Sequence, residues 1–206
     1  MSAHAEAAGH GAEHHGPPIA NKSSKVDATV LGMFLFIGSE AMLFGSFFAA
    51  YFFVRVVNPD APDVWPPHPF EFPKFVAGIN TAILVTSSFT MHWALQAIKR
   101  GNRAGLKAGL SLTFLLGLTF LLTQVLEYSR IGFAPYTDAF GTVFFCLTGL
   151  HGAHVFVGLT LLLAATIRSF RGHYSEEEHL GVEIPGIYWH FVDVMWIVVY
   201  ATVYLL

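Results

Sequence analysis

The sequence predicts an all-α integral membrane protein, a bundle of five transmembrane helices. Hydrophobic residues make up 54% of its 206 residues and charged residues only 12%, with a mean hydropathy of +0.54. A soluble domain carries about 25% charged residues, so this chain has too few charges to cover a water-exposed surface. Five stretches also reach the length of about 20 apolar residues that crosses a hydrocarbon core of about 30 Å.

The five helices are expected at about 28–56, 74–99, 106–129, 138–168 and 184–206. The first apolar stretch contains one charge, Glu40, and the fifth contains Asp193, whereas those at 75–98, 108–126 and 139–167 contain none. Residues 1–27 are rich in Ala, Gly and His and lack the apolar core of a signal peptide, so we expect a polar tail there. The helices leave no room for a soluble domain.

The flanking charges predict the orientation, because Lys and Arg near helix ends resist translocation. One side of the predicted bundle, which includes the N-terminus, carries eight such residues, and the other carries three. The eight are Lys22, Lys25, Lys99, Arg100, Arg103, Lys107, Arg168 and Arg171, and the three are Arg55, Lys74 and Arg130. We therefore expect a cytoplasmic N-terminus and an external C-terminus in a bacterial inner membrane.

Two carboxylates near mid-bilayer need an explanation, because burying a charge in lipid is costly. Glu40 and Asp193 are either functional groups or buried carboxyls bonded to a neighbouring helix. His190 lies one turn before Asp193, and His151 and His154 share a face of the fourth helix. Polar pairs that pack helices are commoner than metal sites, so we expect no bound metal. The single cysteine excludes an intrachain disulfide, and the net charge of −3 argues against nucleic acid as a partner.

Six sequence segments together resemble one family, and they occur in the family's order from about residue 28 to the C-terminus. They are GSEAMLFGSFFAAYF (38–52), WPP (65–67), GINTAILVTSS (78–88), TQVLEY (123–128), FGTVFFCLTGLHGAHVFVG (140–158) and YWHFVDVMWIVVYATVYLL (188–206). The chain is similar to subunit III of the haem–copper oxidases, of the cytochrome c oxidase type. The WPP loop and the tyrosine of YWHF favour that type over the quinol oxidases.

This resemblance implies an accessory subunit of a proton-pumping terminal oxidase, which oxidises cytochrome c and reduces O2 to water. Such a subunit holds no catalytic centre, haem or copper. It packs on subunit I, which carries those groups, and supports its proton uptake and stability. Subunit II, a small subunit IV and membrane phospholipid are the other expected partners. Cytochrome c or quinol would react with the complex and not with this chain.

The resemblance also assigns roles to single residues. The carbodiimide-reactive glutamate of the family falls on Glu40, its HGxH pair on His151 and His154, and its WHFxD pair on His190 and Asp193. These five are expected to form an intramembrane polar network. The QxxEY corner, Gln124, Glu127 and Tyr128, is expected to pack at a helix end, and lipid contacts are expected at Trp65, Trp189 and Arg55.

The chain departs from the family pattern in three places. Many members have seven helices, and this sequence starts where their third would begin, so one wall of their lipid cleft is missing. A tryptophan that many members carry on the first matched helix is Ala49 here. The histidine pair that ends their second matched helix is Leu95-Gln96.

Two other functions are compatible with the residues. A quinol oxidase of the same superfamily has a similar five-helix subunit III. An autonomous ion or proton transporter could use Glu40, Asp193 and the histidines as a relay, but the sequence lacks the repeats and broken helices typical of transporters. A self-contained haem oxidase has too few membrane histidines to be formed by this chain.

Overall fold

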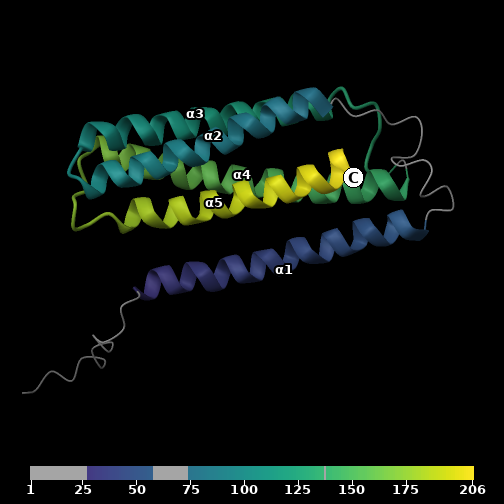
Figure 1. Ribbon diagram of the computed structural model, residues 1–206, viewed down its shortest axis with the longest axis horizontal. Coiled ribbons are helices and arrows are strands. Elements are labelled where there is room, and N and C mark those ends of the chain that lie inside the picture. Colours follow the sequence, from purple (N-terminus) through teal and green to yellow (C-terminus); the bar gives the residue numbers. More distant parts are fainter. Residues whose placement is uncertain (1–26, 58–73, 137) are drawn as a thin grey trace, which may run out of the picture.

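The computed structural model describes residues 27–57, 74–136 and 138–206, and this part of the chain forms five α-helices and no strand. They are α1 (Ala28–Val57), α2 (Lys74–Lys99), α3 (Arg103–Tyr128), α4 (Ala139–Phe170) and α5 (Leu180–Tyr200), and a short π-helix, η1 (Ala201–Leu205), continues α5. Successive helices run in opposite directions along one long axis (Figure 1). The predicted fold class, a helical membrane bundle, is confirmed.

Four of the described helices are long and apolar enough to cross a membrane: α1, α3, α4 and α5 with η1. The exception, α2, is as long as α3 and lies beside it along the bundle (Figure 1). Its lower hydropathy has a simple origin, because polar residues interrupt its apolar run. Among them are Asn80, Ser87, Ser88, His92 and Gln96.

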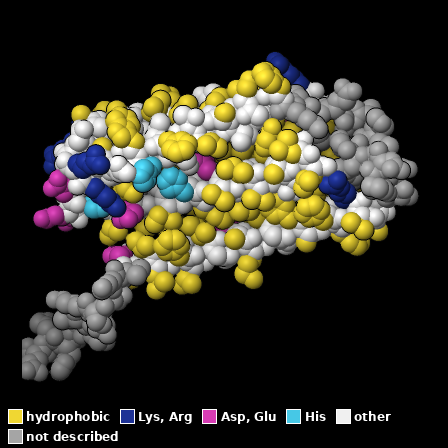
Figure 2. All heavy atoms as spheres, in the orientation of Figure 1, with side chains coloured by type: hydrophobic (Ala, Val, Ile, Leu, Met, Phe, Trp, Pro, Cys, Tyr) yellow, Lys and Arg dark blue, Asp and Glu magenta, His cyan; other side chains and the backbone are white. Residues whose placement is uncertain are grey.

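The helices form a compact group of four with α1 along one side. α1 packs against α4 and α5, and most of its surface is exposed (Figure 1). Charged side chains gather at the end where α1 begins and where the α2–α3 and α4–α5 connections lie (Figure 2). An ion pair there joins Lys99 of α2 to Glu183 of α5, with the nitrogen 3.7 Å from the carboxylate oxygen. The length of the bundle is covered with apolar side chains.

Glycines set the closest helix contacts. A Cβ on Gly109 of α3 would lie 2.7 Å from Cβ and 3.0 Å from Cα of Ala94 in α2, so these two backbones nearly touch. The ring of Trp189 lies between two more glycines, where a Cβ on Gly117 would come within 2.5 Å and one on Gly158 within 2.9 Å. Glycine therefore determines how α5 fits between α3 and α4.

α5 begins four residues before the predicted position and contains Pro185 in its second turn. Proline has no N–H, so it cannot donate to the carbonyl of Gly181, four residues earlier. The hydroxyl of Tyr174, in the α4–α5 connection, donates to that carbonyl at 3.3 Å. Tyr174 is buried, with 5% of its surface exposed, and the Arg168 guanidinium lies 5.7 Å from its ring centre. Tyr174 therefore replaces the helix bond that Pro185 removes.

Replacing Tyr174 by Phe is expected to lower the free energy of unfolding of the chain in detergent by about 1 kcal/mol at pH 8, through the lost hydrogen bond. Burial raises the pKa of the Tyr174 hydroxyl, and the nearby Arg168 partly offsets that rise. The folded state therefore holds the phenol proton more tightly than the unfolded state. This stabilisation is complete below about pH 10, the ordinary tyrosine pKa, and is lost as the pH rises further.

The measurement compares thermal unfolding of wild type and Tyr174→Phe at pH 8 and at pH 10.5. We expect the difference in unfolding temperature between the two proteins to be smaller at pH 10.5 than at pH 8. Tyr136→Phe is the control, because 90% of Tyr136 is exposed, and it should match wild type at both pH values. If the two unfolding temperatures are equal at pH 8, or differ by the same amount at both pH values, the role given to Tyr174 is contradicted.

Candidate functional site

A carboxylate–histidine pair joins α1 to α4. Glu40 Oε2 lies 2.8 Å from His154 Nε2, and His154 Nδ1 lies 2.8 Å from the carbonyl oxygen of Leu150. A carbonyl only accepts, so Nδ1 carries a hydrogen and donates it. His154 Nε2 and Glu40 therefore share one further proton, which lies on either the histidine or the carboxyl. Both side chains are mostly shielded, with 11% of His154 and 19% of Glu40 exposed.

Aromatic rings enclose this pair. Phe44 of α1 lies with its ring centre 5.0 Å from that of His154, and the ring of Tyr188 stacks on the histidine at 6.5 Å. The Tyr188 hydroxyl donates to the backbone carbonyl of His154 at 3.4 Å. The low polarity of these neighbours strengthens the bond between Glu40 and His154.

A second polar group joins α2 to α5 and is centred on Ser88. The Ser88 hydroxyl donates to Asp193 Oδ2 and lies 3.0 Å from His190 Nδ1. Since a hydroxyl has one hydrogen, a bond donated to Asp193 leaves its oxygen to accept from His190 Nδ1–H. Asp193 is 3% exposed, and its other carboxylate oxygen has no hydrogen-bond partner among the described residues. His190 and Asp193 are thus linked through the neighbouring helix.

His151 forms a hydrogen bond with neither of these two groups. Its side chain is completely buried, and its ring centre lies 4.7 Å from that of Trp196 and 5.8 Å from that of Phe120. Neither ring nitrogen has a hydrogen-bond partner within the described chain. The five residues expected to form one network therefore occupy three places: the α1–α4 pair, the α2–α5 group and an aromatic cage around His151.

The QxxEY residues lie near the far end of α3. Gln124 and Glu127 are buried, and Glu127 Oε1 accepts a hydrogen bond of 3.3 Å from the hydroxyl of Tyr204. Tyr128 packs on Phe145 of α4, with the ring centres 5.1 Å apart. These contacts tie the end of α3 to α4 and to the end of the chain.

Of the three residues expected to contact lipid, Trp189 lies in the interior instead. It is completely buried, and its indole N–H donates to Ser87 Oγ at 2.9 Å. Arg55 Nη2 donates to the backbone carbonyl oxygen of Leu206 at 2.9 Å. Trp65 falls outside the described residues.

Ser88 is the residue that sequence reasoning missed. It lies within the GINTAILVTSS segment, but a serine in a transmembrane helix usually bonds to its own backbone. Ser87, its neighbour, does so with the carbonyl of Leu84 at 2.6 Å. Ser88 could have been found by asking which residue of another helix donates a hydrogen bond to the buried Asp193.

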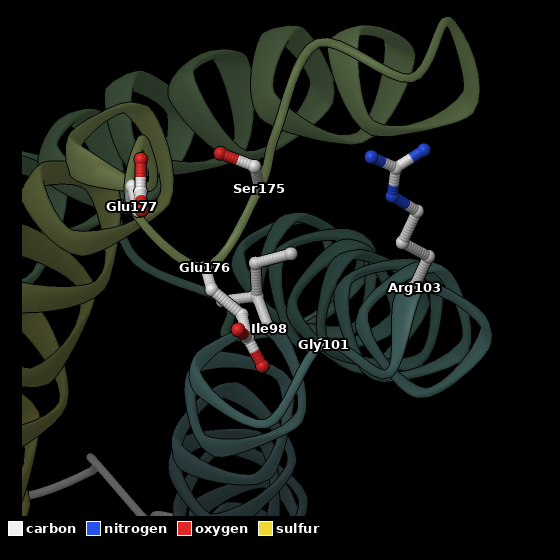
Figure 3. Close-up of a pocket in the computed structure, with 6 residues that line it drawn as sticks. All are labelled: Ile98, Gly101, Arg103, Ser175, Glu176 and Glu177. Atoms are coloured by element: carbon white, nitrogen blue, oxygen red, sulfur yellow. The ribbon is translucent and has the colours of Figure 1, made fainter.

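The described part of the chain holds no grouped metal ligands, and its surface has a pocket at the charged end. Across the described part of the chain, no three His, Cys, Asp or Glu side chains are grouped so that they could hold a metal ion. A surface pocket of about 330 Å³ lies at the charged end, between the α2–α3 and α4–α5 connections (Figure 3). It is lined by Ile98, Gly101, Arg103, Ser175, Glu176 and Glu177. Ile98 lies at the end of α2 and Arg103 at the start of α3, and the other four lie in the connections between helices, away from the buried polar groups.

Comparisons with known proteins agree with one another. The sequence model of the family described as Cytochrome c oxidase subunit III matches residues 19–206. A cytochrome c oxidase subunit 3 of Thermostichus vulcanus is 42% identical over 87% of this chain and 88% of its own length. The same subunit of a Synechocystis species is 40% identical over 94% and 78% of the two chains. That of Loxodonta africana is 36% identical over 92% and 72%.

Proposed function

Because the chain belongs to the cytochrome c oxidase subunit III family, we propose that it packs on subunit I of its oxidase and has no catalytic centre of its own. It is an integral membrane protein and an accessory subunit of a haem–copper oxidase, and so part of an oxidoreductase complex. Its haem and copper reside in partner subunits. Its role is to keep the catalytic subunit stable and supplied with protons.

A structural role is supported by the buried polar groups, which form hydrogen bonds between helices. Glu40 bonds to His154 across α1 and α4, and Ser88 bonds to Asp193 and His190 across α2 and α5. In a bilayer core these groups find no water, so separating the helices would leave each of them unsatisfied. These bonds fix α1 against α4 and α2 against α5, and so present a fixed surface to subunit I.

The Glu40–His154 pair supports the link to proton uptake. Its shared proton can reside on either partner, and 19% of the Glu40 side chain is exposed at the surface of the bundle. The position of that proton sets a local dipole that subunit I experiences across the interface. Glu40, His154, His190 and Asp193 act as positioning groups that hold helices together, with His151 as a packing residue among aromatic rings.

The remaining assignments follow the family and the charge distribution. Cytochrome c is the electron donor of the complex, with quinol as the alternative, and subunit II, a small subunit IV and phospholipid are further partners. The end where α1 begins faces the cytoplasm of a bacterial inner membrane, and the C-terminus faces outside. Basic side chains at the end where α1 begins support this orientation. Those described are Lys99, Arg100, Arg103, Lys107, Arg168 and Arg171.

The test is purification in mild detergent through a tag on this chain, followed by a reduced-minus-oxidised spectrum. We expect haem bands that co-elute with larger hydrophobic subunits, and oxidation of reduced cytochrome c by the eluate. Removing the chain from the complex should leave the haem bands in place while oxidase activity decays faster during turnover.

A colourless eluate with this chain alone would overturn the assignment to the complex. Haem bands that stay with the isolated chain would overturn its non-catalytic role. Oxidation of quinol but not of cytochrome c would replace the proposed donor.

A further inference from the structure

The outward surface of α2 carries two polar side chains, His92 and Gln96, whose hydrogen bond within the described part of the chain is with each other. Phe89, His92, Trp93 and Gln96 follow one another at helical spacing, and all four are exposed; we name them the outer face of α2. Phe89 and Trp93 are 71% and 50% exposed. Gln96 Nε2 lies 2.6 Å from His92 Nε2, a bond between the two polar members of the face.

Other exposed polar residues on the helices, the threonines of α2, α3 and α4, bond to their own backbone and so need no partner outside the bundle. The hydroxyl of Thr86, also on α2, donates to its own helix at the carbonyl of Ala82, at 2.7 Å. Thr119 and Thr160 do the same on α3 and α4. A threonine bonded in this way can face lipid without an unsatisfied donor. The longer side chains of His92 and Gln96 bond to each other and not to a carbonyl of their own helix, so each keeps a donor without a partner in the described part of the chain.

His92 lies within the hydrocarbon region. It stands seven residues before the end of α2 at Lys99, about 10 Å along the helix axis. α2 spans about 39 Å against a hydrocarbon thickness of about 30 Å, so a helix centred on the membrane places His92 about 5 Å inside the boundary. Lipid phosphates lie beyond that boundary, and acyl chains offer no acceptor. The ring of His92 therefore requires a polar partner at that depth, and Gln96, one turn further along, lies at the boundary.

The hydrogen bond also defines what the partner must offer. An amide nitrogen only donates, so His92 Nε2 accepts from Gln96, and the neutral ring carries its hydrogen on Nδ1. The face then presents two donors, the Nδ1–H of His92 and the second N–H of Gln96. A carboxyl or carboxamide oxygen satisfies both, and the flanking Phe89 and Trp93 provide apolar contact for the helix that carries it.

We propose that the outer face of α2 is the docking surface for a transmembrane helix of another oxidase subunit, which places a carboxyl or carboxamide oxygen against His92 and Gln96. This inference rests on the proposed function, because it needs a complex in which such a helix is present. It also explains why α2 is the least apolar helix of the five described: its polar outer residues face protein.

The first test is photocrosslinking in the intact complex, with a benzophenone amino acid replacing Phe89. We expect an adduct with an oxidase subunit, mapped by mass spectrometry to a transmembrane helix that carries Asp, Glu, Asn or Gln within one turn of the crosslink. An adduct with lipid alone would overturn the proposal.

The second test is the double variant His92→Leu, Gln96→Leu, with Thr86→Val as the matched control. We expect the double variant to remain in the detergent-washed complex about tenfold less than wild type, the factor given by two intramembrane hydrogen bonds. The control should remain fully bound, and both variants should unfold at the wild-type temperature when isolated. Full retention of the double variant would overturn the proposal.

A wrong docking surface and a wrong function give different experimental results. If the tagged wild-type chain brings down no haem-bearing subunit, the proposed function is wrong. If it brings them down while Phe89 crosslinks only to lipid, the function stands and the docking surface is wrong.

Discussion

Gly109→Val is expected to force α2 away from α3 and to destabilise the bundle by about 3 kcal/mol or more. The Cβ alone would lie 2.7 Å from Cβ and 3.1 Å from the backbone nitrogen of Ala94, and the branched side chain adds two more carbons. Overpacking a rigid interior costs about 1–3 kcal/mol, and here the obstacle is backbone that cannot change rotamer. Thermal unfolding of the full chain in detergent, followed by circular dichroism, would measure the loss.

Gly149→Val is the matched control for that experiment. Gly149 also lies within a long apolar helix, but a Cβ built there meets no atom within 4 Å. The same substitution should therefore change the stability of the isolated chain by no more than about 0.5 kcal/mol. If both variants lose the same stability, valine destabilises through its helix propensity. The close approach of α2 and α3 then contributes nothing to the loss.

The fold could be predicted because the bilayer constrains it so strongly. A helix that must cross about 30 Å of hydrocarbon needs a long apolar run, and five such runs are visible in the sequence. The start of α5 was harder to place, because Leu180 to Glu183 are not uniformly apolar and the prediction began only at residue 184. Helices continue past the hydrocarbon boundary, where polar side chains cost little.

The candidate site could be predicted only in part. Glu40 and Asp193 stand out in any sequence, since a carboxyl in lipid needs a reason. Their partners depend on how each helix is rotated about its axis, and the sequence does not reveal that rotation. His151 and His154 share a helix face, yet one lies among aromatic rings while the other bonds to Glu40.

The roles of the glycines also depend on helix rotation, which the sequence does not reveal. Gly149, Gly152 and Gly158 are equivalent as sequence, but a Cβ on Gly158 alone would meet the ring of Trp189. Trp189 itself resembles an interfacial tryptophan in sequence, although it fills the centre of the bundle. Which side of a helix faces its neighbours is decided by the packing of all five helices together.

Ser88→Ala is expected to destabilise the chain by about 2 kcal/mol, although it removes a single oxygen atom. The hydroxyl donates to Asp193 and lies 3.0 Å from His190 Nδ1, and Asp193 is almost completely buried. Deleting one partner leaves buried polar groups unsatisfied, which costs about 1–3 kcal/mol, more than the bond itself contributes. Ser46→Ala provides the comparison, since that exposed hydroxyl bonds only to the carbonyl of Leu43 in its own helix.

A double-mutant cycle separates this effect from a general loss of packing. In the background Asp193→Leu there is no buried carboxylate for Ser88 to satisfy, so removal of the hydroxyl should cost much less than in wild type. The difference between the two costs is the coupling energy of the pair, which we expect to exceed about 1 kcal/mol. Equal costs in both backgrounds would mean that Ser88 stabilises the bundle by filling space. Asp193 would then be held in the membrane interior by some other contact.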